Sequence, residues 1–189
     1  ARVEQCNKIL DRTGANFIHP YDNYDVILGQ STCAKEIYED KNIPNLDTII
    51  CPVGGGGLAS GTIKATEFFS PKTKVILAEP ENASDAYASF NQKKLIPVKN
   101  PNTIADGLKT SLSQKTYNII VSGAEEIITV SEEEIIKSMK MIWERLKIIC
   151  EPSCSLPLAA ILKNKAKFKN QSVGIILTGG NIDLSKIPF

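Results

Sequence analysis

Short apolar runs rich in β-branched residues recur along the chain. Most lack the alternation of apolar and polar residues that a half-buried strand shows. These runs predict strands at residues 16–18, 48–53, 75–78, 127–130 and 173–177. Segments with apolar residues at helical spacing lie between them and predict helices at 31–39, 58–69, 83–91, 114–122 and 131–150. Because such strands alternate with helices, we expect an α/β fold: an open, mostly parallel sheet with helices on both faces.

Segment 131–150 has the clearest helical pattern. Ser131 and Glu134 have the spacing of a capping box, in which each side chain bonds the other residue's backbone N–H. One apolar face follows: Ile135, Met139, Ile142, Leu146 and Ile149. We expect Pro152 to end this helix, since proline cannot continue the hydrogen-bond ladder. Residues 95–113, rich in Pro, Asn and Lys without periodicity, predict a long functional loop or a boundary.

Composition narrows the class of partner. The 189 residues carry a net charge of +1 with acids and bases interspersed, so we expect small molecules as partners, not nucleic acid or a membrane surface. No apolar run is long enough to span a bilayer. The 5 cysteines lack the spacing of a disulfide framework, which indicates free thiols and a cytoplasmic location. Cys150 and Cys154 could suggest zinc, but with His19 as the only imidazole we interpret them as buried thiols.

Four consecutive glycines, residues 54–57, lie between the apolar run 48–53 and the helix-like segment 58–69. Without Cβ atoms, such a turn lets several backbone N–H groups approach one anion, and the following helix adds its positive end. A nucleoside-triphosphate loop is excluded, because no Gly-Lys-Ser/Thr follows the glycines. A dinucleotide fingerprint stays open, since Gly54, Gly56 and Ala59 satisfy G-x-G-x-x-A and Glu79 lies about 20 residues further on. The position of the glycines weighs against this fingerprint, which normally opens its domain, because a strand and a helix are expected before them.

Two further clusters lie where strands are expected to end. Glu79 and Asp85, with the backbone carbonyls between them, could form an oxygen-ligand site for Mg²⁺ or Ca²⁺, or simply a solvated helix start. The turn Thr178-Gly179-Gly180 ends the last predicted strand, so both glycine turns should share the carboxyl edge of the sheet, where ligands bind in open α/β folds. The hydroxyl of Thr178 would suit a planar ring nitrogen, although a simple turn remains an alternative.

Several of these motifs, in order, resemble the fold-type II pyridoxal-phosphate enzymes, with the strongest likeness to serine racemase and the short threonine (serine) dehydratases. The resemblance covers nearly the whole chain. It rests on His19-Pro20-Tyr21-Asp22, Ile27-Leu28-Gly29-Gln30-Ser31-Thr32, Pro52-Val53-Gly54-Gly55-Gly56-Gly57-Leu58, Ala78-Glu79-Pro80, Thr103-Ile104-Ala105-Asp106-Gly107, Glu151-Pro152 and Thr178-Gly179-Gly180-Asn181. Several ordered motifs together are more specific than one glycine loop.

The resemblance implies a cofactor, pyridoxal 5'-phosphate, and residues that hold it. Gly54, Gly55, Gly56 and Gly57, with the amide of Leu58, would bind the phosphate. Thr178 would face the pyridine nitrogen, and Glu151 would lie near the ring. A neutral hydroxyl does not stabilise a protonated pyridine as a carboxylate would, so the ring becomes a milder electron sink.

The serine racemase branch implies further sites. Glu79, the carbonyl of Ala83, and Asp85 would bind a divalent cation, Mg²⁺ or alternatively Ca²⁺ or Mn²⁺. Arg2 and Thr110 match positions near the substrate, while Lys147 and Asn181 match positions near a nucleotide effector, ATP. Tyr21 replaces an asparagine of some members, so we assign it no contact. A homodimer is expected.

The family's Schiff-base lysine does not appear here, and residues 2–10 already read as mid-helix without a cap. We therefore interpret residues 1–189 as most of the large phosphate-binding domain, lacking the N-terminal strands, the small domain and that lysine, and we expect this segment alone to be inactive. The complete enzyme would deaminate L-serine or L-threonine to a 2-oxo acid and ammonia, or racemise serine. Alternatives are a stand-alone phosphate- or dinucleotide-binding module, or a non-catalytic partner of a lysine-bearing chain.

Overall fold

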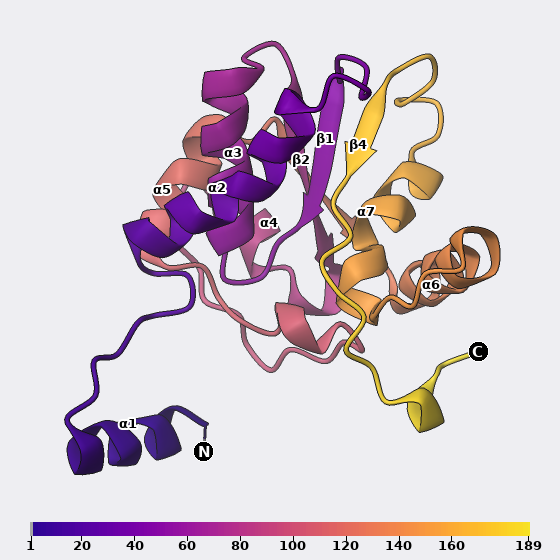
Figure 1. The fold of residues 1–189 in the computed structure, drawn as a ribbon. Coiled ribbons are helices and arrows are strands. Elements are labelled where there is room, and N and C mark those ends of the chain that lie inside the picture. Colours follow the sequence, from indigo (N-terminus) through magenta and orange to yellow (C-terminus); the bar gives the residue numbers. More distant parts are fainter. Residues whose placement is uncertain (1) are drawn as a thin grey trace.

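The computed structural model describes residues 2–189, with side chains from residue 4 onward, and confirms a parallel α/β sheet. The strand order is β3-β2-β1-β4 (Figure 1). The strands are β1 (Thr48–Pro52), β2 (Lys74–Pro80), β3 (Glu126–Val130) and β4 (Val173–Ile175). All neighbouring pairs are parallel, so every strand ends at the same edge, and Ile50 lies opposite both Ile76 and Ile175.

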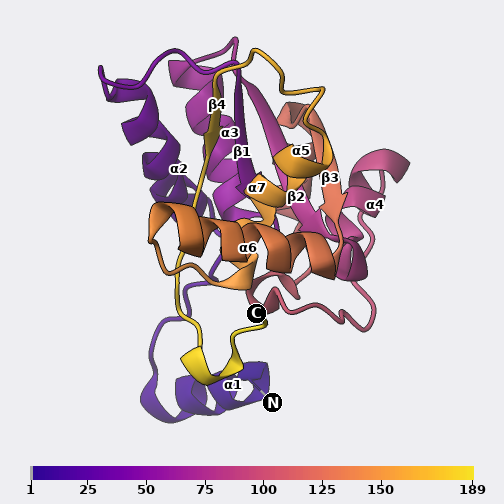
Figure 2. The same cartoon turned by 90° about the vertical axis from the view of Figure 1, so that its right-hand side faces the viewer.

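Helices cover both faces of the sheet, as predicted. They are α1 (Arg2–Thr13), α2 (Tyr24–Glu39), α3 (Gly57–Phe69), α4 (Asp85–Gln92), α5 (Gln114–Gly123), α6 (Glu132–Leu146) and α7 (Pro152–Lys163). Helices α2, α3 and α5 lie on one face, and α6 and α7 lie on the other (Figures 1 and 2). Helix α1 lies apart from the sheet, joined to α2 by an irregular segment (Figure 1). None of the described helices is long and apolar enough to cross a membrane.

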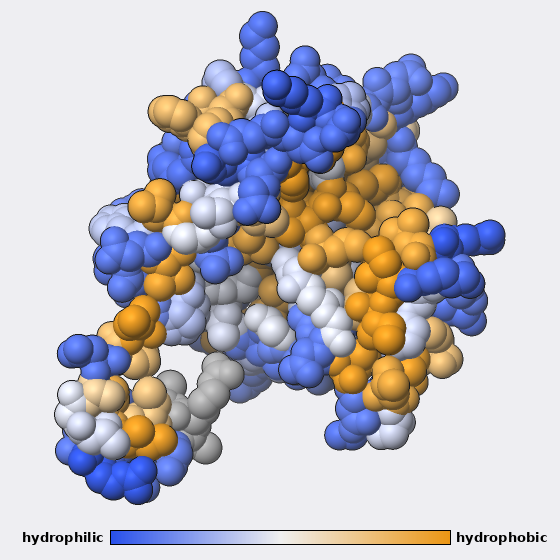
Figure 3. All heavy atoms as spheres, viewed as in Figure 1, coloured by the Kyte–Doolittle hydropathy of each residue, from blue (hydrophilic) through white to orange (hydrophobic). Residues whose placement is uncertain are grey.

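The core has two layers, because successive strand side chains point to opposite faces. In β1, Ile49 packs with Ile63 of α3 in one layer, whereas Ile50 packs with Leu156 of α7 in the other. All these side chains are fully buried. Burial on both faces explains why the strand sequences are continuously apolar rather than alternating. At the edge, β4 is only half-buried, and apolar surface extends over β4 and α7 (Figure 3).

Two predictions before β1 are wrong in detail. Residues 16–18 form no strand; Phe17 and Ile18 are exposed in the segment between α1 and α2. Their apolar, β-branched character resembles that of a strand, but no neighbouring strand pairs with them. Helix α2 begins at Tyr24 rather than residue 31, because the side chain of Asn23 caps it by accepting the N–H groups of Asp25 and Val26.

The region after β3 also differs from expectation. The capping box of Ser131 and Glu134 is present, but α6 ends at Leu146, where Lys147 takes a left-handed conformation with φ 59°. Consequently Leu146 and Ile149, expected on the apolar face, are each 56% exposed. Pro152 begins helix α7 instead of ending α6. Helix α7 was missed because most of its residues are buried, which leaves only a weak amphipathic period.

Candidate functional site

The glycine loop connects the carboxyl end of β1 to the start of α3. Gly56 is the N-cap of α3 and has φ 88°, a left-handed conformation that glycine adopts without strain. No side chain caps this helix start. The first N–H groups of α3 therefore remain available to an anion, and the helix adds its positive end.

The glycines are also required by the protein segments that contact them. A Cβ at Gly55 would overlap the ring of Tyr21, and one at Gly57 would lie 2.9 Å from the Cβ of Tyr21. At Gly56 it would lie 2.7 Å from the Cβ of Thr116. Anion binding is therefore not the only reason for these glycines, because residues 19–22 and α5 pack directly against the loop.

A cavity of about 760 Å³ opens at this edge of the sheet. All the residues expected to hold the cofactor line it: Gly54, Gly55, Gly56, Gly57, Leu58, Glu151 and Thr178. Thr110, expected near the substrate, lines it as well, together with Gly107 from the predicted long loop. The prediction that the two glycine turns share one edge is therefore confirmed.

Glu151 and Thr178, from the turn after β4, line the same cavity as the glycine loop. The backbone N–H of Glu151 donates to the carbonyl of Gly179 at 3.0 Å, which ties the start of α7 to this turn. Burial, and then the charge of Asp106, raise the pKa of Glu151 above 4.5. This carboxyl group therefore holds a proton more readily than an exposed one.

Glu79 and Asp85, the expected metal ligands, lie outside this cavity. Glu79 is the last residue but one of β2 and is fully buried. Its carboxylate accepts the N–H groups of Ala86 and Tyr87 at 2.8 Å, so it caps α4. Asp85 accepts the N–H of Leu112, while its buried Oδ1 has no hydrogen-bond partner among the described residues. Burial raises the pKa of Glu79 well above 4.5 and that of Asp85 to about 6. No described group of three or more His, Cys, Asp or Glu side chains could hold a metal, so a cation here would need backbone oxygen.

Other expected site residues are less informative. Arg2 belongs to α1, but its side chain lies outside the described ones. Lys147 and Asn181 are exposed, and neither lines the cavity. Cys150 and Cys154 are buried free thiols, as interpreted from the sequence.

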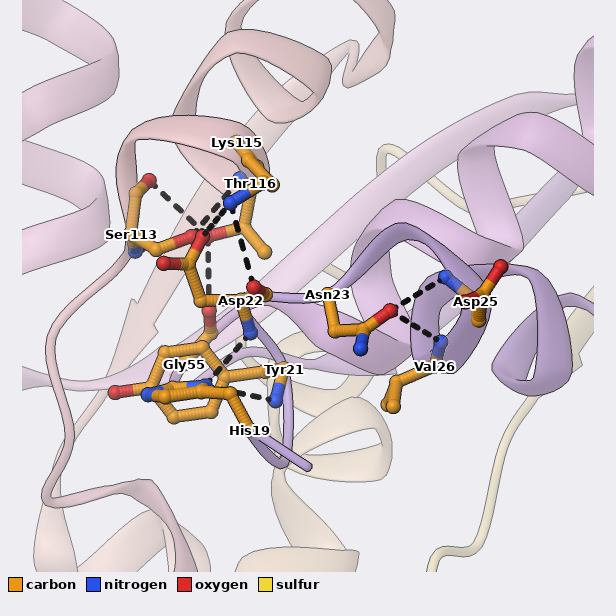
Figure 4. A network of polar contacts seen from close by, with 10 residues as sticks. All are labelled: His19, Tyr21, Asp22, Asn23, Asp25, Val26, Gly55, Ser113, Lys115 and Thr116. Atoms are coloured by element: carbon orange, nitrogen blue, oxygen red, sulfur yellow. Dashed lines mark hydrogen bonds and ion pairs between the residues drawn. The ribbon is translucent and has the colours of Figure 1, made fainter. Parts of the chain in front are cut away.

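Sequence reasoning missed two groups at the cavity. Ser153 lines it, and its hydroxyl accepts the N–H of Gly107 at 3.1 Å, fixing the long loop against α7. Tyr21, to which no contact was assigned, lines it beside His19, with the two rings edge to face 4.6 Å apart (Figure 4). The sequence signal for Tyr21 was its place in the motif His19-Pro20-Tyr21-Asp22, next to which the glycine loop leaves space for the ring.

Comparisons with known proteins agree with this geometry. Residues 1–179 match the family described as PALP, pyridoxal-phosphate dependent enzyme. A beta-hydroxyaspartate dehydratase of Paracoccus denitrificans is 46% identical over 100% of this chain and 59% of its own length. The crystal structure of serine racemase from Dictyostelium discoideum is 45% identical, with a TM-score of 0.87 over 97% of this chain and 59% of that one.

A third similar structure, a threonine deaminase from T.th., has a TM-score of 0.89 and 36% identity over 94% of this chain and 65% of that one. The chain thus spans about 60% of the length of these relatives. Its family match covers far more than half of its residues. The chain therefore belongs to the pyridoxal-phosphate dependent enzymes.

Proposed function

We propose that this chain supplies the phosphate-binding part of an enzyme that deaminates small 3-hydroxy amino acids, L-serine or L-threonine, to a 2-oxo acid and ammonia, or racemises serine. The observation that carries the proposal is the meeting of the glycine loop, Glu151 and Thr178 in one cavity. The names of the relatives support the reaction class, since they include a dehydratase, a racemase and a deaminase.

The residues present fit the cofactor. Backbone N–H groups of residues 54–58 at the start of α3 suit a phosphate dianion, and Gly56 alone supplies the left-handed turn. The hydroxyl of Thr178, which lines the same cavity, would face the ring nitrogen. When bound, pyridoxal phosphate supplies an electron sink for charge developing at the substrate α-carbon.

The residues of this chain would hold the cofactor and the substrate in place. The loop amides would bind the phosphate, and the neutral hydroxyl of Thr178 would leave the ring nitrogen without a full countercharge. Glu151, whose pKa is raised, would hold a proton at its carboxyl oxygen. Thr110 would contact the substrate, and Arg2 would bind its carboxylate.

We further propose that the Schiff-base lysine belongs to a part of the protein outside this sequence. Among the described residues, no lysine lines the cavity. Residues 1–189 would then form most of the large domain, and missing strands would continue the sheet beyond the half-buried β4. The apolar surface over β4 and α7 in Figure 3 supports a covering segment there.

The metal and effector sites are proposals of the same kind. Glu79, the carbonyl of Ala83, and Asp85 would bind Mg²⁺, Ca²⁺ or Mn²⁺. The unpartnered Oδ1 of Asp85 and the raised pKa values of both carboxyls support a cation, which would relieve their burial. Lys147 and Asn181 would contact ATP. A homodimer and a cytoplasmic location complete the proposal.

The test uses the full-length protein, purified with and without pyridoxal phosphate. Activity is measured on L-serine, L-threonine and D-serine, with and without Mg²⁺ and ATP. Cofactor-dependent release of 2-oxo acid or interconversion of serine enantiomers supports the proposal. The absence of both reactions would overturn it.

The dinucleotide alternative predicts tight NAD binding that Glu79→Ala abolishes. The structure makes this unfavourable, because Glu79 lies outside the cavity that the glycine loop lines.

A further inference from the structure

Two segments far apart in the sequence meet on either side of the glycine loop. Residues 19–22 precede α2, and residues 113–116 begin α5; Figure 4 shows them facing each other across Gly55. The hydroxyl of Thr116 donates to the carbonyl of Gly55 at 2.9 Å. The ring of Tyr21 fills the space that a Cβ of Gly55 would need. The loop is therefore held from both sides.

A compact turn fixes Tyr21 in this place. The Nδ1 atom of His19 accepts the backbone N–H of Asp22 at 2.8 Å and that of Tyr21 at 3.3 Å. Because Nδ1 accepts both bonds, the proton of the neutral ring belongs on Nε2. The turn thus depends on the backbone of Asp22 as well as on the imidazole.

The side chain of Asp22 ties this turn to α5. Lys115 Nζ lies 3.2 Å from Asp22 Oδ1 and also donates to the Asp22 carbonyl at 3.4 Å. The hydroxyl of Ser113, and then Lys115, hold the pKa of Asp22 below its ordinary value of 3.8. Asp22 therefore stays ionised throughout the physiological range, and the ion pair persists there.

We propose that Asp22 and Lys115 are positioning residues that hold the phosphate-binding loop in its anion-binding geometry. Their ion pair fixes residues 19–22 against α5, so Tyr21 and Thr116 fix Gly55 between them. The inference rests on the proposed phosphate role of residues 54–57. The two side chains are 36% and 38% exposed, so the pair contributes little to folding by itself. Its effect falls on the orientation of the loop.

The test compares cofactor with and without its phosphate. The full-length protein, stripped of cofactor, is titrated with pyridoxal phosphate and with pyridoxal. We expect Asp22→Asn and Lys115→Met each to weaken binding of pyridoxal phosphate about threefold to fivefold, the range of a partly exposed ion pair, and to leave pyridoxal unchanged. The double variant should lose no more than either single variant, and Lys115→Arg should retain affinity.

Matched controls separate the effect of the Asp22–Lys115 ion pair from general effects of charge. Asp25→Asn removes an exposed carboxylate three residues away, and Lys74→Met breaks the exposed ion pair with Glu125 at the start of β2. Both should bind pyridoxal phosphate as the parent does. Unchanged affinity in Asp22→Asn, equal weakening of both ligands, or additive losses would each overturn the inference.

A loop variant separates this inference from the proposed function. Gly56→Ala should lose the preference for pyridoxal phosphate over pyridoxal. If Gly56→Ala keeps that preference, the phosphate role of the loop is wrong, and the inference falls with it. If Gly56→Ala loses the preference while Asp22→Asn keeps it, only the positioning role is wrong.

Discussion

Substitution of Gly56 by alanine tests the link between loop geometry and phosphate binding most directly. Gly56 has φ 88°, and a Cβ there would lie 2.7 Å from Thr116 Cβ and 2.9 Å from Leu112 Cδ2. A left-handed alanine costs about 1–2 kcal/mol, and forcing a methyl into packed surroundings costs about 1–3 kcal/mol. The free energy of unfolding should therefore fall by about 2–5 kcal/mol.

Part of this strain can be relieved by moving the loop amides away from the anion. A loss of about 1.4 kcal/mol in phosphate binding is tenfold in Kd. We expect Gly56→Ala to weaken pyridoxal phosphate about tenfold or more, measured by titration of the cofactor-free full-length protein. Urea unfolding of the same samples gives the stability change.

Substitutions at two other glycines separate the backbone cost of alanine from the steric cost of its Cβ. Gly14 also has positive φ, 65°, but an added Cβ would meet nothing within 4 Å, so Gly14→Ala should show the backbone cost alone. Gly29 lies inside α2, with ordinary φ and open space, so Gly29→Ala should stabilise by about 0.5–1 kcal/mol. Neither should alter cofactor affinity. Parent-like affinity in Gly56→Ala, or a stability loss no larger than that of Gly14→Ala, would refute the reasoning.

Three further outcomes are expected. Chelation of divalent cations should lower the thermal unfolding midpoint of the full-length protein, and Asp85→Asn should remove this sensitivity; a midpoint indifferent to Mg²⁺ would contradict the metal site. Burial and Asp106 raise the pKa of Glu151, so its ionisation disfavours the folded state as pH rises above 4.5. Glu151→Gln should therefore unfold at a higher temperature than the parent at about pH 7 but not at about pH 4. Residues 1–189 alone, mixed with pyridoxal phosphate and reduced with borohydride, should carry no cofactor on a specific lysine by mass spectrometry; stoichiometric labelling of one lysine would show that this segment contains the reactive amine.

Local sequence rules predicted the elements whose signals lie within a few residues. The capping box of Ser131 and Glu134 and the doubly buried strands β1 and β2 are of this kind, because capping and hydrophobic periodicity are short-range. Helix α7 was not predictable in this way, since the burial of most of its residues weakens the periodic pattern. The strand predicted at residues 16–18 is wrong for a different reason. Their composition is typical of a strand, but a strand also needs a pairing partner, and the tertiary structure places no described strand beside them.

By itself, the sequence determined the α/β class and the family resemblance, and it predicted anion binding at residues 54–57, because these depend on patterns and short motifs along the chain. Only the tertiary structure decided that Glu151 and Thr178 line one cavity with those glycines, and that Glu79 caps α4. It also decided that Tyr21, Asp22 and Lys115 hold the glycine loop. These contacts join residues separated by many tens of positions, and their geometry depends on how the sheet brings loop ends together at one edge.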